Sequence, residues 1–485
     1  MSLPKFLTDK NLIPNITINP NLNYLGTETA FGFGAEVLAV ENSKKFPQIF
    51  KFHVGDTGPT TPEPIIDIAI QALKNKQTKY GHFAGYPQVR ENIARYWSET
   101  RGVEIKKENV LLQPGGKPVI ELMFQALLAP GDKIIVQDPG YPVYESLAEF
   151  NNHDGVLRWQ AHKNESPSAG SAGSPQGGVQ GKTLEFRVED LEKLLAGNNQ
   201  VKILCLNTPQ NPTGMIIGKE KLEAIAELVR KHKFFVIFDD IYDQIVFGGR
   251  KQYSFLSIPG MLDWTINLNG YSKNYAMTGW RLGFIIAPEW VIEIFGRLAI
   301  NKWSNVNRME QIVAGAIYGD VTLDGFEYKS VKDEVQAIIS KDFIEYEKKG
   351  GFVSESLNLL KPYIVCNEAE GAFYLFPSFQ RVLDLKYVKE NLGLKSDVDL
   401  RNWLLYERGV ATLSGSDFGK MGAGYIRFSY AEDRNRHIIP GMKYILKVVI
   451  ELIEKSNEIA PLKVEEVDEK VGELEKKYFE VGKVC

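Results

Sequence analysis

The residues with the clearest chemical potential lie in one loop, where a lysine and an arginine stand eight positions apart, Lys273 and Arg281. Apolar runs typical of buried strands, residues 264–268 and 284–287, flank this loop. Burying an unpaired ammonium between two strands would cost free energy, so a buried lysine here requires a chemical reason. An imine between Lys273 and an aldehyde cofactor provides one, with Arg281 binding an anionic group of that cofactor. A Lys/Arg pair at the edge of a sheet is the alternative.

Three other sets of residues follow predicted buried strands. Asp239 follows the apolar run 234–238. If the aldehyde cofactor carries a pyridine ring, a carboxylate at this position could keep the ring nitrogen protonated. Asn211 lies in a loop that two prolines and a glycine make rigid, which suits an amide that must meet a planar ring. Gly115-Gly116 precedes a predicted helix, where backbone N–H groups and the helix dipole favour a phosphate. Each motif alone is weak, because an acidic residue can cap a helix and the loop can be a plain turn.

The elements that must position these residues alternate between strands and helices from Val110 onward. Short continuous apolar runs between helices predict a mostly parallel α/β sheet that is covered on both faces. Ligands of such sheets bind at the carboxyl ends of the strands, where we expect the residues above to meet. The predicted strands span residues 110–113, 133–137, 201–206, 234–238, 264–268 and 284–287, and the predicted helices residues 27–42, 65–76, 89–101, 117–128, 219–231 and 442–455.

Together, these motifs resemble those of class I and II aminotransferases of the aspartate aminotransferase type, which use pyridoxal 5′-phosphate (PLP). The resemblance rests on residues 270–283, on the Asp239-x-x-Tyr242 element and on Asn211-Pro212-Thr213-Gly214, and it extends over about residues 27–431. It implies fold type I, in which a mostly parallel seven-stranded sheet is sandwiched by helices and a smaller α+β domain is built from both chain ends. The implied parts are an N-terminal segment contributing to the small domain and to dimer contacts (1–64), a large PLP-binding domain (65–320), a small C-terminal domain (321–460) and a charged helical tail (461–485).

The resemblance also implies a role for each matching residue. Lys273 is the imine lysine and moves a proton as general base and acid, Asp239 faces the pyridine nitrogen, and Arg427 binds the substrate's α-carboxylate. An arginine fork suits a carboxylate, although a structural salt bridge is the alternative for Arg427, as a packing aromatic is for Tyr141. The full set comprises the catalytic residues Lys273, Asp239 and Tyr242, the cofactor-binding residues Tyr80, Gly115, Gly116, Lys117, Tyr141, Asn211, Asp239, Tyr242, Ser272, Lys273 and Arg281, and the substrate-binding residues Gly55, Lys117, Asn211 and Arg427.

A homodimer with shared active sites is also implied, because the tyrosine that matches Tyr80 reaches the cofactor phosphate of the neighbouring subunit in similar enzymes. The chain departs from the family pattern at two interface elements. His82-Phe83 replaces the usual Pro-Pro, and Val306 replaces the proline expected after Ser304-Asn305. The shape of both elements is therefore left open.

The implied activity is the transfer of an amino group between an L-amino acid and a 2-oxo acid. Lys117 stands where a bacterial subgroup has a lysine near the distal carboxylate of its substrate, which favours aspartate or glutamate with 2-oxoglutarate or oxaloacetate. A solvated lysine at a helix start is the alternative for Lys117. An aromatic or alanine aminotransferase and a PLP-dependent C–S lyase would use the same residues. A PLP-sensing regulator is disfavoured, because residues 1–26 are too short and proline-broken for a helix-turn-helix segment.

Composition argues against several other classes of protein. A net charge of -4 over 485 residues provides no broad basic field for nucleic acid. No apolar run approaches the ~20 residues of a membrane helix, and residues 1–20 have no apolar signal-peptide core. The three cysteines and six histidines are scattered without metal-ligand spacing, so we expect no metal site, and free thiols predict a cytoplasmic location.

Two segments lie outside the resemblance. Residues 164–181 are of low complexity and predict a flexible surface loop. The tail carries an apolar stripe with spacings of three and four that is shorter than the ~3–4 heptads of a coiled coil, so a helix packed on its own domain is favoured. The stripe consists of Val464, Val467, Val471, Leu474, Tyr478 and Val481.

Overall fold

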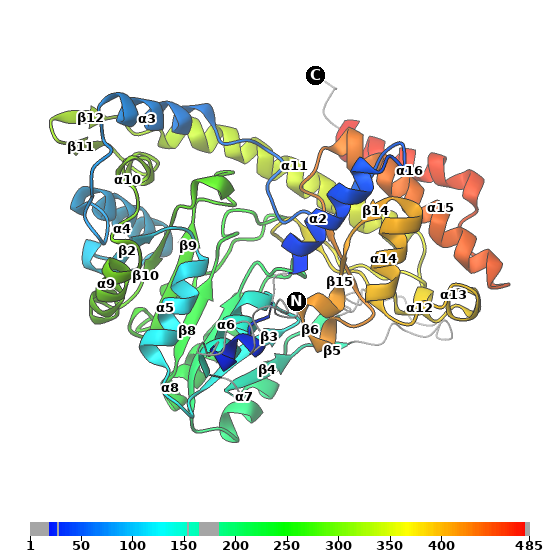
Figure 1. Ribbon diagram of the computed structural model, residues 1–485, viewed down its shortest axis with the longest axis horizontal. Helices are drawn as coiled ribbons and strands as arrows, with labels where there is room; N and C mark the ends of the chain where they lie inside the picture. The colour runs from blue at the N-terminus through cyan, green and yellow to red at the C-terminus, as the bar shows by residue number, and fades with distance from the viewer. Residues whose placement is uncertain (1–18, 27–28, 153–154, 164–183, 481–485) are drawn as a thin grey trace, which may run out of the picture.

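A seven-stranded sheet organises the molecule (Figure 1). The computed structural model describes residues 19–26, 29–152, 155–163 and 184–480. Across the sheet the strand order is β2 (Val110–Gln113), β10 (Gly283–Ile286), β9 (Thr265–Gly270), β8 (Phe235–Asp239), β7 (Val201–Asn207), β3 (Lys133–Asp138) and β4 (Val156–Gln160). All neighbouring pairs are parallel except those of β10, which runs antiparallel to both β9 and β2. The predicted α/β class with a mostly parallel seven-stranded sheet is confirmed.

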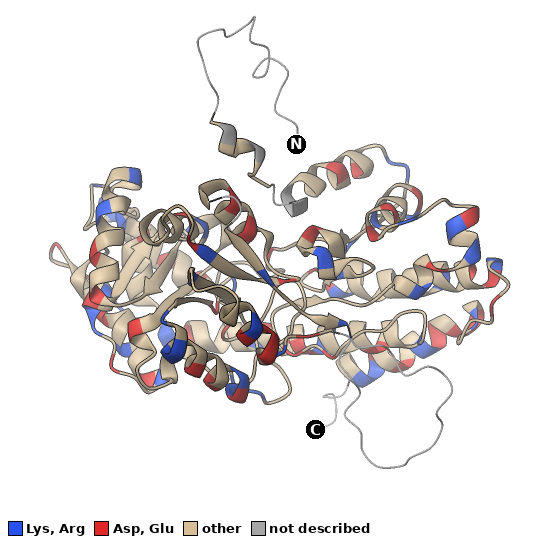
Figure 2. Cartoon of the chain, turned by 90° about the horizontal axis from the view of Figure 1, so that it is seen from below, with Lys and Arg blue, Asp and Glu red and all other residues tan. Residues whose placement is uncertain are grey.

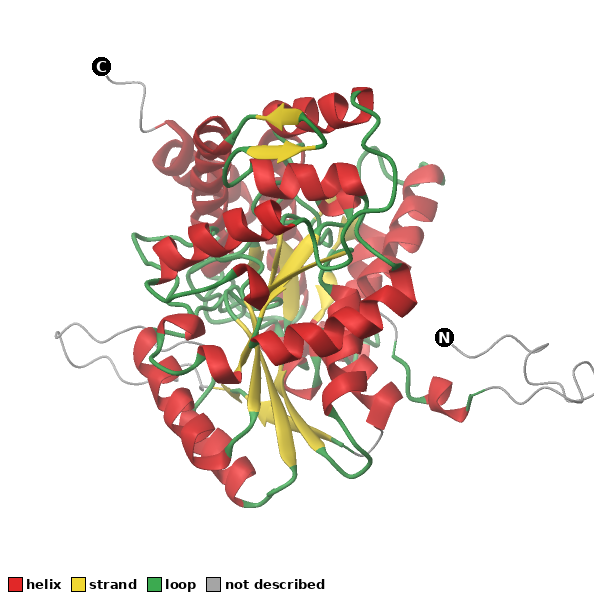
Figure 3. Ribbon diagram, turned by 90° about the vertical axis from the view of Figure 1, so that its left-hand side faces the viewer, coloured by secondary structure: helices red, strands yellow, loops and turns green. Residues whose placement is uncertain are grey.

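Helices cover both faces of this sheet (Figure 3). One face packs against α5 (Lys117–Leu127), α6 (Pro142–Asn152) and α9 (Glu289–Trp303), and the other against α7 (Val188–Ala196) and α8 (Lys219–His232). In β8, Ile237 belongs to the first apolar cluster, whereas Val236 and Phe238 belong to the second. Burial on both faces explains why these strands are rich in apolar residues.

A third apolar cluster lies over β2 and β10. It is formed by helices α3 (Glu63–Lys74), α4 (Pro87–Arg101) and α10 (Arg308–Ala316), with the hairpin of β11 (Val321–Leu323) and β12 (Phe326–Tyr328). Trp97 of α4 packs edge-on against Phe284 of β10, with ring centroids 5.6 Å apart. Helix α4 ends at Gly102, whose φ of 66° is a left-handed cap that glycine adopts without strain. This packing places the last turn of α4 next to the strand ends of the sheet.

A smaller α+β unit is built from both ends of the chain, as the fold prediction expects. β1 (Phe50–Lys51) pairs in parallel with β14 (Val410–Ala411), and β13 (Tyr374–Leu375), β16 (Ile426–Ser429) and β15 (Leu413–Ser414) form a second, antiparallel sheet. The helices here are α2 (Thr29–Asn42), α11 (Lys332–Asn358), α12 (Gln380–Leu383), α13 (Lys386–Glu390), α14 (Asp397–Arg408) and α15 (Ile439–Lys455). The limit at residue 320 remains a prediction, since Val335 and Ile339 of α11 pack in the cluster over β2 and β10.

The charged tail forms α16 (Val467–Glu475), which packs against α11 and α15. Val467 and Val471 are fully buried in the core of the smaller unit. Phe479 packs on Phe352 with ring centroids 5.5 Å apart, and the Tyr478 hydroxyl donates to Glu355 at 2.6 Å. In the described residues the tail helix packs on the smaller unit, and Val481 lies outside them. The predicted loop 164–181 also lies outside them.

The surface of both units carries mixed charge. Lys and Arg are interspersed with Asp and Glu along the helices (Figure 2). Among the residues that the structure describes, no helix is long and apolar enough to cross a membrane.

Candidate active site

Lys273 lies in the loop that joins β9 to β10. Its Nζ donates to the backbone oxygen of Gly55 at 2.5 Å and lies 5.7 Å from the centroid of the Phe373 ring. The side chain is half-buried, whereas the sequence predicts a buried lysine. The reason is that Lys273 faces the junction between the sheet and the smaller unit, where Gly55 meets it. A partly exposed amine can exchange one bonding partner for another, as imine chemistry requires.

Asp239 is the last residue of β8 and is 6% exposed. The Tyr144 hydroxyl donates to its Oδ2 at 2.5 Å, and the Ile241 N–H donates to its Oδ1 at 3.1 Å. Burial raises the pKa of this carboxyl to about 6, against the opposing effects of both hydrogen bonds and of the Lys273 ammonium. Asp239 ends β8, and Lys273 lies three residues beyond the end of the neighbouring parallel strand β9, so both candidate catalytic groups lie at the same edge of the sheet. At pH 7 the carboxyl is mainly ionised and can hold a cationic ring nitrogen.

Tyr144 is absent from the predicted site. It lies three residues after Tyr141, and three residues is the spacing that places two side chains on the same face of a helix. The two rings meet edge-on with centroids 5.8 Å apart. This spacing at the start of α6 is the sequence signal that could have found Tyr144.

The turn between β2 and α5 forms a cradle against Arg281. Gly115 has φ of 83°, and a Cβ added there would lie 2.6 Å from Nη2 of Arg281. A Cβ on Gly283 would lie 3.2 Å from the backbone carbon of Gly115. Arg281 is itself oriented by donation from its Nη1 to the backbone oxygen of Thr278 at 2.8 Å. These glycines let the Arg281 guanidinium lie directly against the backbone at the start of α5, and a helix start beside a guanidinium favours a phosphate.

Arg427 lies on β16 and is 2% exposed. Its Nη1 donates to Oδ1 of Asn211 at 3.1 Å, and its Nη2 to the backbone oxygen of His53 at 2.7 Å. The guanidinium stacks on Tyr374 at 4.5 Å. A Cβ on Gly55 would lie 3.9 Å from Nη2, so the structure brings Arg427, Asn211 and Gly55 together. Burial, and then the charge of Arg427, lower the pKa of His53 to about 4, which keeps that imidazole neutral.

The other predicted residues occupy varied positions. The Tyr242 hydroxyl is buried and lies 3.1 Å from that of Tyr374. Gly116, Lys117 and Ser272 are half-buried at the start of α5 and beside Lys273. Tyr80, in contrast, is 84% exposed in the single chain.

A cavity of about 550 Å³ adjoins the site. Its lining includes neither Lys273 nor Arg427, but it does include Tyr141, Tyr144, Cys205, Asn207 and Phe418.

Comparisons with known proteins identify the class of protein to which this fold and this site belong. Residues 48–438 match the family model of class I and II aminotransferases. The chain belongs to this family of fold type I, PLP-dependent transferases.

Individual relatives agree with that assignment, and solved structures share the fold. A probable aspartate/prephenate aminotransferase of Aquifex aeolicus is 30% identical over 415 residues, which cover 85% of this chain and 94% of that protein. An aromatic-amino-acid aminotransferase of Thermococcus litoralis is 30% identical over 387 residues, covering 79% and 87%. The structure of aspartate aminotransferase from Thermus thermophilus with maleate superposes with a TM-score of 0.73 at 24% identity, covering 89% of this chain and 99% of that one, a likeness of fold.

Proposed function

We propose that this aminotransferase binds PLP between Lys273, Asp239 and the Gly115 turn. The observation that carries the proposal is the placement of a half-buried amine and a buried carboxylate at the same ends of the neighbouring parallel strands β9 and β8. The cradle of Gly115 and Arg281 fits the phosphate, and the donor set fits the ring. When bound, the cofactor supplies an aldehyde that links to amines and a ring that accepts electrons.

Residues of the chain provide the proton transfer, the partner for the ring nitrogen and the binding of the substrate. Lys273 would take the proton from the substrate's Cα as general base and deliver it, as general acid, to the carbon of the cofactor's aldehyde group. The Asp239 carboxylate keeps the ring nitrogen protonated. Arg427 holds the substrate's α-carboxylate with two parallel N–H donors, and the backbone of Gly55 lies beside it. The buried rings of Phe373 and Tyr374 lie beside this centre, the first under Lys273 and the second under Arg427.

For the substrate we propose aspartate or glutamate, with 2-oxoglutarate or oxaloacetate as acceptors. Support comes from Lys117, half-buried at the first position of α5, and from the aspartate/prephenate relative. An aromatic substrate is the second candidate, favoured by the Thermococcus litoralis relative and by the aromatic rings Tyr141 and Phe418 in the adjoining cavity.

A half-reaction panel tests the cofactor and the substrate together. The protein loaded with PLP is mixed with single amino acids, and formation of pyridoxamine phosphate is followed by absorbance. We expect conversion by aspartate and glutamate, and we expect Lys117→Ala to lower kcat/KM for aspartate about 10–100-fold, the effect of one charge-assisted hydrogen bond, with alanine little changed. Equal loss for both substrates would exclude the proposed role of Lys117, and faster conversion of phenylalanine or tyrosine would favour the aromatic candidate.

We also propose a homodimer in which Tyr80 completes the partner's site. The exposed Tyr80 is free to reach another subunit, and helix α9 leaves Ile294 and Ile300 exposed. The buried thiols of Cys205 and Cys366 support a cytoplasmic location.

Mixed dimers of Lys273→Ala and Tyr80→Ala test the shared site. We expect Tyr80→Ala alone to weaken PLP binding about tenfold or more, because a hydrogen bond to a phosphate is lost. In a mixed dimer one site keeps its own Lys273 and receives Tyr80 from the other subunit. Activity at limiting PLP should therefore exceed that of either parent, with dimer mass checked by light scattering. Mixtures no more active than the Tyr80→Ala parent would show that Tyr80 does not act across subunits.

A further inference from the structure

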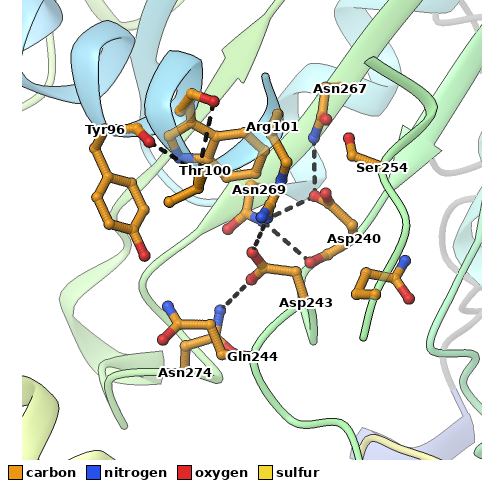
Figure 4. A network of polar contacts seen from close by, with 12 residues as sticks. Tyr96, Thr100, Arg101, Asp240, Asp243, Gln244, Ser254, Asn267, Asn269 and Asn274 are labelled. Atoms are coloured by element: carbon orange, nitrogen blue, oxygen red, sulfur yellow. Dashed lines mark hydrogen bonds and ion pairs between the residues drawn. The ribbon is translucent and has the colours of Figure 1, made fainter. Parts of the chain in front are cut away.

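A buried polar network connects the loop that carries Asp239 with the loop that carries Lys273 (Figure 4). The backbone ladder between β8 and β9 ends at the pair Asp239 and Leu268. Beyond that pair β8 ends, whereas β9 continues to Gly270 alongside β10. Side chains continue the connection, and they come from three elements: Asp240 and Asp243 after β8, Asn267, Asn269 and Asn274 on or after β9, and Arg101 at the end of α4.

Asp240 ties the residue next to Asp239 to β9. Its Oδ1 accepts from Nδ2 of Asn267 and from Nδ2 of Asn269, both at 2.8 Å. The same amide of Asn269 donates to the backbone oxygen of Asp240 at 3.0 Å. All three side chains are fully buried or nearly so. Burial, and then the neighbouring Asp243, raise the pKa of Asp240 well above its usual range, so this carboxyl needs no cation of its own.

Asp243 ties the same loop to the residue next to Lys273. Its Oδ1 accepts from Nδ2 of Asn274 at 2.7 Å, and its Oδ2 pairs with Nη2 of Arg101. Its backbone N–H donates to the oxygen of Asp240 at 2.8 Å. One carboxylate therefore holds Asn274, and through it the position of Lys273.

Arg101 supplies the positive charge of this network. Its guanidinium stacks on Trp97 at 4.5 Å from the ring centroid. The side chains of Arg101 and Asp243 are 13% and 6% exposed, so the pair is shielded from water and salt. A planar fork that stacks on one side and bonds a carboxylate on the other is a geometry that lysine cannot reproduce.

We propose that Arg101 is a positioning residue for transamination. By fixing Asp243 it holds Asn274 and Lys273 at a set distance from Asp239, and this distance would have to accommodate the cofactor between the Lys273 amine and the Asp239 carboxylate. Arg101 itself lies one layer behind the ring and acts through Asp243. The inference rests on the roles proposed above for Lys273 and Asp239.

The test replaces the buried ion pair by apolar side chains. Arg101→Met alone would leave Asp243 buried without its cation and could prevent folding. The double variant Arg101→Met/Asp243→Leu removes both charges and is expected to keep a melting temperature near that of the wild type. We expect its kcat to fall about 10–100-fold, as misplacement of a catalytic group does, with KM for the amino acid changed less than about threefold. PLP binding should weaken, and the absorbance band of lysine-linked cofactor should shift or shrink.

Two further variants complete the design. Arg101→Lys keeps the charge and should recover part of kcat but not all of it. Arg408→Met is the control, because Arg408 also stacks on an aromatic ring, at 4.8 Å from Trp403, and pairs with Glu451 at 3.3 Å, but lies in the smaller unit. We expect its spectrum and kcat to match the wild type.

The possible outcomes separate this inference from the proposed function. If the wild type fails to link PLP, the proposed function is wrong and this inference with it. If the wild type links PLP and the double variant matches its kcat, spectrum and PLP affinity, only the role of Arg101 is wrong. Should the double variant not fold, Asn274→Ala decides, since it removes the same link without removing a charge. A wild-type spectrum and kcat for Asn274→Ala would overturn the proposal.

Discussion

Replacement of Lys273 by alanine should lower turnover by at least about 10⁴-fold, because one amine provides both the covalent link and the proton transfer. The absorbance of lysine-linked PLP should disappear in the same variant. Stability should change little, since the side chain is half-buried and loses one hydrogen bond, to Gly55, worth about 1 kcal/mol. Stopped-flow turnover, absorbance spectra and thermal unfolding measure the three quantities.

Lys273→Arg is the matched control for charge. A guanidinium keeps the positive charge near Asp239 but stays protonated in proteins, so it can neither form the link nor accept a proton. Both variants should therefore be equally inactive. An active Lys273→Arg enzyme would mean that position 273 contributes only charge, and the assignment of the site would fail.

Asp239→Asn should lower turnover by at least about 10²-fold and yet stabilise the PLP-free protein at neutral pH. Burial raises the pKa of Asp239 to about 6, so the folded state binds a proton more tightly than the unfolded chain does. The contribution of this carboxyl to stability is therefore fully present below about pH 4 and is lost as pH rises through about 6. A shift of about two pKa units corresponds to about 3 kcal/mol. Asparagine avoids this cost but cannot hold a cationic ring nitrogen, which explains the loss of turnover.

Chemical denaturation of the PLP-free protein at pH 4 and at pH 7 tests the stability effect. The gain from Asp239→Asn should appear at pH 7 and vanish at pH 4. Cys205→Ser, at a nearby buried position on β7, serves as a control whose effect should not vary over this range. An equal effect of Asp239→Asn at both pH values would show that the carboxyl is not strained by burial.

The central strands are the part of the fold that the sequence predicts best. The prediction for β2 agrees to the residue, and those for β7, β8 and β9 agree within two residues at each end. These strands are buried on both faces, so most of their residues are apolar and the runs are easy to recognise, although β9 also buries Asn267 and Asn269. The edge strand β4 is not predicted, because Arg158 interrupts it. Helix α11 is also missed, because Lys349, Gly350 and Gly351 interrupt its apolar stripe and are buried or half-buried by partners distant in sequence.

The residues of the site also fall into two groups: those that a short sequence motif predicts, and those whose roles depend on contacts with residues distant in sequence. The polar residues that follow strands directly, Asp239, Asn211 and Gly115, are predicted because their chemistry lies within one short motif. Tyr144 and Arg101 are not, since their roles depend on contacts across the fold: Arg101 meets a carboxylate 142 positions later in the chain. An arginine at the end of a helix is ordinary in sequence, and only packing reveals its partner.

The pairing of β1 with β14 has a consequence for synthesis of the protein. Phe50 cannot pair with Val410 until Val410 has been synthesised. At ordinary ribosomal speeds of about 5–20 residues per second, this takes roughly 20–70 s. Until then Phe52, which is fully buried in the folded protein, has no completed core to pack into. The growing chain therefore carries Phe50 and Phe52 without their partner strand until Val410 has been made, and a chaperone that binds this segment would raise the yield of active enzyme.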